Sequence, residues 1–101
     1  MAIKAILQTI DGKKENEVVD SRYSLASIWP FGDQSFPLLQ YIDPYGNTVF
    51  NGLQMPEVQK ELELLIGKAL SDEQRDTLGQ IRDLAVSCQK EPHMFLRFRG
   101  D

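Results

Sequence analysis

The side chains best suited to nucleophilic or metal chemistry are one cysteine, Cys88, and one histidine, His93. A closed zinc site needs four Cys or His ligands, so the sequence predicts no metal centre of this kind. Nucleophilic catalysis needs a base within hydrogen-bond reach of the thiol. Cys88 shares an apolar helical stripe with Ile81 and Leu84, which is typical of a core cysteine, and Pro92 separates it from His93. These two residues therefore predict no catalytic pair.

Two aspartates suggest a second kind of chemistry, because paired carboxylates can act as general acid and base. Asp33 and Asp43 lie on turns that flank one predicted strand. An acidic turn residue usually accepts hydrogen bonds from nearby backbone N–H groups instead. The chain also has no glycine-rich loop followed by a lysine-bearing helix. We therefore expect no enzyme and no cofactor, with a small-molecule-binding domain or minor enzyme that uses Asp33, Asp43 and His93 as the alternative.

Large aromatic side chains point to recognition of a partner. Trp29 precedes the segment that contains Asp33, and Tyr45 lies in a tight turn. Trp and Tyr are favoured interface anchors because they bury much area at a small entropic cost. The alternative for Trp29 is a place in the core beneath the sheet. We expect Trp29, Asp33 and Tyr45 to contribute to a partner-binding surface.

Acidic residues gather in the second half of the chain. Asp72, Glu73 and Asp76 crowd one predicted helix start, and residues 57–91 contain eight acidic and five basic residues. A solvated helix face explains such a pattern, and so does an electropositive partner. We expect these three residues to bind a basic partner. The glutamates that decorate the preceding predicted helix are Glu57, Glu61 and Glu63.

The overall charge argues against nucleic acid as a partner. The formal net charge is −4, whereas nucleic-acid binding draws most of its affinity from basic residues. One stretch near the C-terminus keeps a third hypothesis open. Phe95, Arg97 and Arg99 alternate on one face of a predicted strand, as a small RNA-binding module would need.

These side chains need a scaffold, and the first half of the chain predicts two strand pairs around a short helix. Alternating apolar residues predict a strand over residues 2–10, with residues 17–20 as its hairpin partner. Ser21 predicts the N-cap of a short helix over residues 22–29. A second hairpin is predicted from strands 38–42 and 48–50. The turn between them, Asp43-Pro44-Tyr45-Gly46, has the residue order of a type I turn.

The second half predicts two helices and a closing strand. Pro56 is favoured at a first helical position, and apolar residues then recur at helical spacing as far as Ala69. Ser71 and Gln74 form a capping-box pattern before a second helical stripe that ends near Cys88. Residues 94–99 predict the last strand. The order β-β-α-β-β-α-α-β indicates an α+β fold: a mostly antiparallel sheet of about five strands, covered by an antiparallel helix pair and a short helix.

Length and composition fit this scaffold. The 101 residues predict one domain over residues 1–101, and 42% hydrophobic residues predict a folded chain with a core. No unbroken apolar stretch indicates a secretion signal or a membrane span. A single cysteine permits no internal disulfide, which is typical of a reducing compartment. We therefore expect a cytoplasmic protein with no membrane partner.

Two stretches carry a resemblance to known proteins. Residues 35–51, centred on Asp43-Pro44-Tyr45-Gly46, resemble a group of small bacterial proteins of unassigned activity. Residues 92–98, followed by Gly100 and Asp101, look like the ending of the same group. The chain departs from that group's pattern at Asn47, where aspartate is expected, and at Arg99, where an apolar residue is expected. The shared features are a turn and a closing strand, so they imply a fold.

In size, acidity and class the chain also resembles immunity proteins of bacterial toxin–immunity pairs, in particular those of contact-dependent growth inhibition. This resemblance implies a cytoplasmic inhibitor that binds and neutralises a cognate toxin, a basic nuclease domain, by occluding its active site. Acidic side chains would stand in for phosphates, and aromatic anchors would supply buried area. It implies no oligomeric state and no particular toxin.

Overall fold

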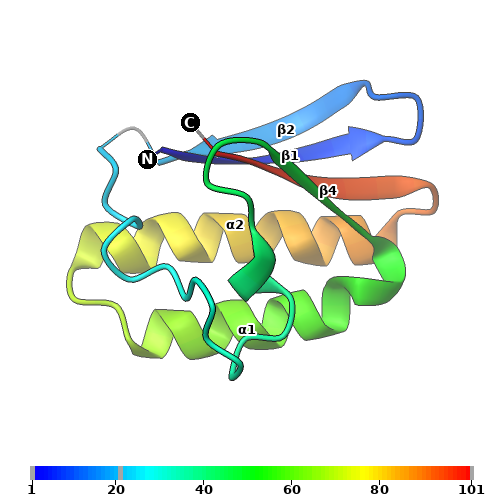
Figure 1. Ribbon diagram of the computed structural model, residues 1–101. Coiled ribbons are helices and arrows are strands. Elements are labelled where there is room, and N and C mark those ends of the chain that lie inside the picture. The colour runs from blue at the N-terminus through cyan, green and yellow to red at the C-terminus, as the bar shows by residue number, and fades with distance from the viewer. Residues whose placement is uncertain (1, 21, 101) are drawn as a thin grey trace.

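The computed structural model describes residues 2–20 and 22–100, and an antiparallel sheet forms one of its two layers (Figure 1). Alternation of side chains builds the sheet: Ala5 pairs with Val18 on one side and with Phe98 on the other, and all three are buried. The strand order is β2-β1-β4-β3. The strands are β1 (Ile3–Thr9), β2 (Lys14–Val19), β3 (Asn47–Asn51) and β4 (Met94–Gly100).

Two helices form the other layer. They are α1 (Met55–Gly67), which carries a proline in its first turn, and α2 (Asp72–Lys90). α2 packs against β1, β2 and β4, and α1 packs against α2 (Figure 1). Both helical stripes predicted from the sequence face the core. The buried residues among them are Val58, Leu62, Leu65, Leu78, Ile81, Leu84, Ala85 and Cys88.

The long segment between β2 and β3 closes the open side of the core although it has little regular structure. Trp29 is its central residue: the indole Nε1 donates to the Leu39 carbonyl at 3.1 Å, and the ring centroid lies 6.0 Å from that of Phe98. Phe36 and Ile42 of the same segment are also buried in the core. The segment therefore contributes to stability through side-chain burial, which needs no continuous backbone ladder.

The predicted strand over residues 38–42 is wrong. This stretch contains a short 3-10 helix, η1 (Leu39–Tyr41), and β3 pairs with β4 instead. The cause lies on α1, where the Glu61 carboxylate accepts the backbone N–H groups of Leu38 at 3.0 Å and Leu39 at 2.8 Å. These donors are therefore not free to form a strand ladder. Within the described residues the sheet has four strands, one fewer than expected.

The predicted helix over residues 22–29 is also absent, since the described residues there form successive turns. Tyr23 has a φ of 57°, which breaks a right-handed helix. The Asp20 carboxylate accepts the backbone N–H groups of Ser24 at 3.0 Å and Leu25 at 2.8 Å. The predicted cap, Ser21, lies outside the described residues, and Asp20 accepts the N–H groups of the turn that replaces the helix.

The Asp43-Pro44-Tyr45-Gly46 turn is present and packs tightly on the end of β4. Asp43 Oδ1 accepts the Tyr45 N–H at 2.8 Å, and the Gly46 carbonyl accepts the Gly100 N–H at 2.8 Å. A Cβ atom on Gly100 would lie 2.4 Å from the backbone of Asp43 and Pro44. Only glycine therefore fits at the end of β4 without a shift of the turn.

Neither α1 nor α2 has the length and apolar content that a bilayer-crossing helix requires.

Candidate partner-binding end

The start of α2 is the structural centre of the candidate site. Ser71 Oγ accepts the Gln74 N–H at 3.1 Å, as the capping-box pattern predicts. The other half of the box differs, because Gln74 Oε1 accepts the Leu70 N–H at 2.6 Å and Nε2 donates to the Ser24 carbonyl at 2.8 Å. Gln74 thereby joins the segment that follows β2 to the start of α2.

The three acidic residues predicted at this helix start are all exposed. Asp72 is paired with Arg75 one turn later, and Glu73 lies 3.7 Å from Arg22 of the preceding segment. Within the described part of the chain, no cationic side chain lies within 4.0 Å of Asp76. Exposed ion pairs of this kind contribute little to stability. The carboxylates also complement the positive end of the helix dipole.

Three large exposed side chains lie at this end of the molecule. Tyr23 and Leu70 are near the three carboxylates, and Tyr45 is on a neighbouring turn. Tyr23 is 58% exposed, Leu70 is 80% exposed and Tyr45 is 83% exposed. The left-handed backbone of Tyr23 is costly for a bulky residue and is often found where a side chain must be presented for function. We call the set Tyr23, Tyr45, Leu70, Asp72, Glu73 and Asp76 the acidic end.

A chain of contacts links Tyr45 to the start of α2. The turn that contains Tyr45 is bonded to Gly100, and Gly100 is paired with Ile3 across the sheet. The Ile3 carbonyl accepts the Asp20 N–H at 2.9 Å. Asp20 is three residues before Tyr23 in the sequence. Figure 1 shows the same arrangement: α2 begins at the end of the molecule where β1 begins and β4 ends.

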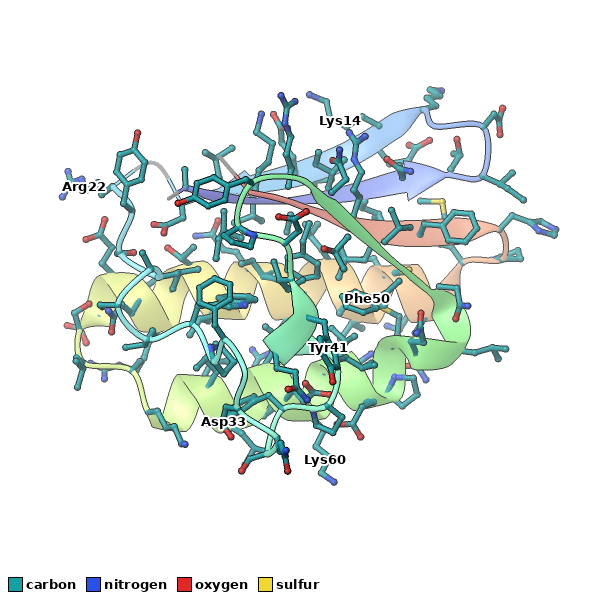
Figure 2. All side chains as sticks on the ribbon, in the orientation of Figure 1. Lys14, Arg22, Asp33, Tyr41, Phe50 and Lys60 are labelled. Atoms are coloured by element: carbon teal, nitrogen blue, oxygen red, sulfur yellow. The ribbon has the colours of Figure 1, made fainter. Side chains whose placement is uncertain are left out.

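Two of the predicted anchor residues lie elsewhere. Trp29 is only 5% exposed, so it belongs to the core and offers little area to a partner. Asp33 lies far from Arg22 in Figure 2, and its carboxylate accepts the Ser35 N–H at 2.9 Å. Asp33 therefore acts as an acidic turn residue. We leave both outside the acidic end.

The alternative site of Asp33, Asp43 and His93 is not assembled. The turn of Asp43 packs on Gly100, where β4 ends, whereas His93 immediately precedes Met94, where β4 begins. A strand of this length separates them by about 20 Å. Asp43 and His93 therefore lie at opposite ends of β4 and do not converge on one point.

Glu61 was expected on a solvated helix face and is instead fully buried. Burial and a hydrogen bond with Glu57 raise the pKa of Glu61 from 4.5 to about 7, against the opposing effect of its two backbone donors. Its position did carry a signal, because Glu61 follows Val58 by three residues and precedes Leu65 by four. That spacing places it on the apolar stripe.

No local pattern marked Tyr23 or Leu70 as exposed, since both are apolar enough to suit a core. Cys88 is fully buried, and burial raises the pKa of its thiol. Over residues 2–20 and 22–100, no three His, Cys, Asp or Glu side chains converge as metal ligands would.

Comparison of the chain with protein-family models, with curated proteins and with solved structures finds no match.

Proposed function

We propose that this chain is a cytoplasmic immunity protein, which binds a cognate toxin domain through the acidic end and occludes its active site. The observation that carries the proposal is the presence of exposed Tyr23 and Leu70 beside Asp72, Glu73 and Asp76, with Tyr45 at the same end. These residues come from three separate segments. Tyrosine side chains are frequent energetic anchors of protein interfaces, and a polar rim usually surrounds them.

The charge of the helical layer supports a basic partner. Residues 57–91 carry eight acidic and five basic side chains, a formal net charge of −3, of which the buried Glu61 contributes little at the surface. Opposite charge accelerates encounter, and the acceleration decreases as salt is added. A basic nuclease domain fits this surface, because its active site attracts phosphates and would attract carboxylates in their place. The aromatic side chains would then supply the buried contact area.

The direct test uses the product of the neighbouring reading frame as the partner. Its C-terminal domain should arrest growth when produced alone, and production of this chain should relieve the arrest. The two purified proteins should form a complex that survives size-exclusion chromatography. A non-toxic neighbour that also fails to bind would contradict the proposal.

Charge reversal tests which surface is used. The double variant Asp72→Lys, Glu73→Lys should slow association with the toxin domain about tenfold at low salt and flatten its salt dependence. The matched control is Asp11→Lys, Glu15→Lys: both residues are exposed, they lie near the β1–β2 turn at the other end of the sheet, and the net charge changes equally. Equal slowing by both double variants would show a non-specific charge effect and exclude the acidic end.

Tyr23→Asn tests the anchor, because Asn tolerates the left-handed backbone of this position and removes the phenol ring. We expect at least a tenfold faster dissociation of the complex with little change in association. Surface plasmon resonance measures both rates on one sample. An unchanged dissociation rate would exclude Tyr23 as an anchor.

A further inference from the structure

Among residues 2–20 and 22–100, helices cover only one face of the sheet, and the other face is open (Figure 1). Figure 2 shows Lys14 on the open side and Phe50 on the helix side. On the central strand β4, Leu96 and Phe98 are fully buried against the helices. The alternate residues Phe95, Arg97 and Arg99 therefore lie on the open face. We call Lys4, Lys14, Glu17, Phe95, Arg97 and Arg99 the basic face.

Cations dominate this face. Lys4 is paired with Arg99 across β1 and β4, and Lys4 and Lys14 share one acidic neighbour, Glu17, at 3.9 and 3.2 Å. Among the described residues, neither Arg97 nor Arg99 has a carboxylate within 4.0 Å. The basic face thus carries a net charge of +3. Because the formal net charge of the whole chain is −4, the remaining residues carry −7.

Arg97 has an unfilled hydrogen-bonding position. Its Nε atom is buried and has no acceptor among the described residues. Ile6, directly opposite on β1, is 3% exposed although it lies on the open face, so neighbouring long side chains cover it. A buried donor without an acceptor is uncommon and costs free energy. A phosphate or carboxylate bound on the open face would satisfy it once the side chain turns to expose Nε.

A groove lies at the end of the sheet beside Phe95. It has a volume of about 680 Å³, which is in the range of ligand sites, and its apolar lining includes Ile10, Leu53, Met94 and Phe95. Leu53 is 93% exposed and Ile10 is 64% exposed, so the groove has apolar walls that water now contacts. The Asn51 side chain, on the strand next to Phe95, adds a polar edge.

We propose that a single-stranded nucleic acid binds across the basic face, with its phosphates on Arg97, Arg99 and Lys4 and a base stacked on Phe95 in the groove. Base stacking on an aromatic ring beside a basic track is the common mode of single-strand recognition. An apolar groove with a polar edge matches a base better than it matches a chain of carboxylates. Part of the −7 lies near this site, since Glu91 also lines the groove and the Asp43 turn packs on Gly100. Charges more than about 8 Å away are screened at physiological salt and act weakly here.

The probes are fluorescently labelled RNA and DNA single strands of about 12 nucleotides, long enough to cover one site of this kind. Fluorescence polarisation across a salt series should give a slope of log affinity against log salt of about −2, from three phosphate contacts at about 0.7 each. Arg99→Gln should reduce that slope by about 0.7. Phe95→Leu should weaken binding roughly five- to a hundredfold without changing the slope. Tighter binding of RNA than of DNA would assign a contact to the 2′-hydroxyl.

The matched control is Lys60→Gln, which removes an exposed cation from α1 on the opposite layer (Figure 2). It should leave affinity and slope unchanged. Absence of binding at low salt, or equal slopes for Arg99→Gln and Lys60→Gln, would overturn the proposal. A polyglutamate chain of the same charge that binds as tightly as RNA would overturn it in favour of an acidic protein partner. Arg99 is exposed, so we expect Arg99→Gln to fold normally. The salt-slope test therefore still applies if Phe95→Leu fails to fold.

Discussion

Replacement of Glu61 by Gln should remove a pH dependence that the fold has built into its core. The Glu61 side chain is fully buried, and it holds the segment before β3 through the backbone N–H groups of Leu38 and Leu39. Glutamine keeps one oxygen that can accept both hydrogen bonds, and it cannot ionise. Its amide can also donate to Glu57. The substitution therefore changes the charge of the site and little else.

The sign of the effect follows from the two pKa values. The Glu61 pKa is about 7 in the folded chain and 4.5 when the residue is solvated. Between these values the folded state holds a proton that the unfolded state releases, so the free energy of unfolding falls as pH rises from about 5 to 7. Each pH unit between the two values is worth 1.36 kcal/mol, which gives a total loss of about 3 kcal/mol. Below about pH 4.5 the contribution is fully present.

Chemical denaturation at several pH values measures this loss. Trp29 is buried and is the only tryptophan, so its fluorescence reports unfolding. We expect Glu61→Gln to match the parent protein near pH 5 and to exceed its unfolding free energy by up to about 3 kcal/mol at pH 8. Glu15→Gln is the control, because Glu15 is exposed on β2. It should keep the pH dependence of the parent protein.

Two results would refute the reasoning. One is a parent protein that becomes more stable between pH 5 and 7, which would mean that the two backbone donors outweigh burial. The other is an identical pH slope in Glu61→Gln, which would place the titrating group elsewhere. Glu61→Ala is a useful contrast, because it leaves the Leu38 and Leu39 N–H groups without this acceptor. Neither Ala nor Gln ionises, so Glu61→Ala should be about 2–5 kcal/mol less stable than Glu61→Gln at every pH.

Three further predictions concern the fold. Gly100→Ala should lower the unfolding free energy by about 1–3 kcal/mol, because the added methyl group would clash with the Asp43–Pro44 backbone. Gly67→Ala is the control and should not lower it, because no atom lies within 4 Å of the added methyl group. Denaturation midpoints of the two variants measure the difference. Asp20→Asn should cost about 1–3 kcal/mol, because an amide oxygen cannot replace both carboxylate oxygens that accept bonds from the following turn. Cys88 should react with a thiol reagent about a thousandfold more slowly in the native protein than in denaturant; comparable rates would contradict its burial.

The net charge of the whole chain hides an uneven distribution of charge between its two layers. The net charge of −4 argued against nucleic acid as a partner. Strand pairing separates that charge into a helical layer of one sign and a sheet face of the other. The separation depends on Lys4 and Lys14 lying on the same face as Arg97 and Arg99. Sequence alternation placed Arg97 and Arg99 together, but only the sheet register brought the two lysines from β1 and β2 to them.

The sequence by itself determined the elements whose signals are local. The periodicity of α1 and α2, the alternation in β1 and β4, the Ser71 cap and the Asp43–Gly46 turn depend on residues within a few positions of each other. Hydrogen bonds and burial over such short distances follow directly from residue order. The core stripe that ends at Cys88 was predictable for the same reason.

Tertiary structure decided the rest, because distant groups competed for the same backbone donors. Residues 38–42 have the composition of a strand, yet a carboxylate 23 residues away in sequence accepts the Leu38 N–H. Asp20 similarly captures the donors of a segment with a helical stripe. The acidic end depends on the same long-range contacts, since Tyr45 and Tyr23 reach it through Gly100 and Ile3. Which partner a polar group finds is set by three-dimensional packing, and residue order alone does not contain it.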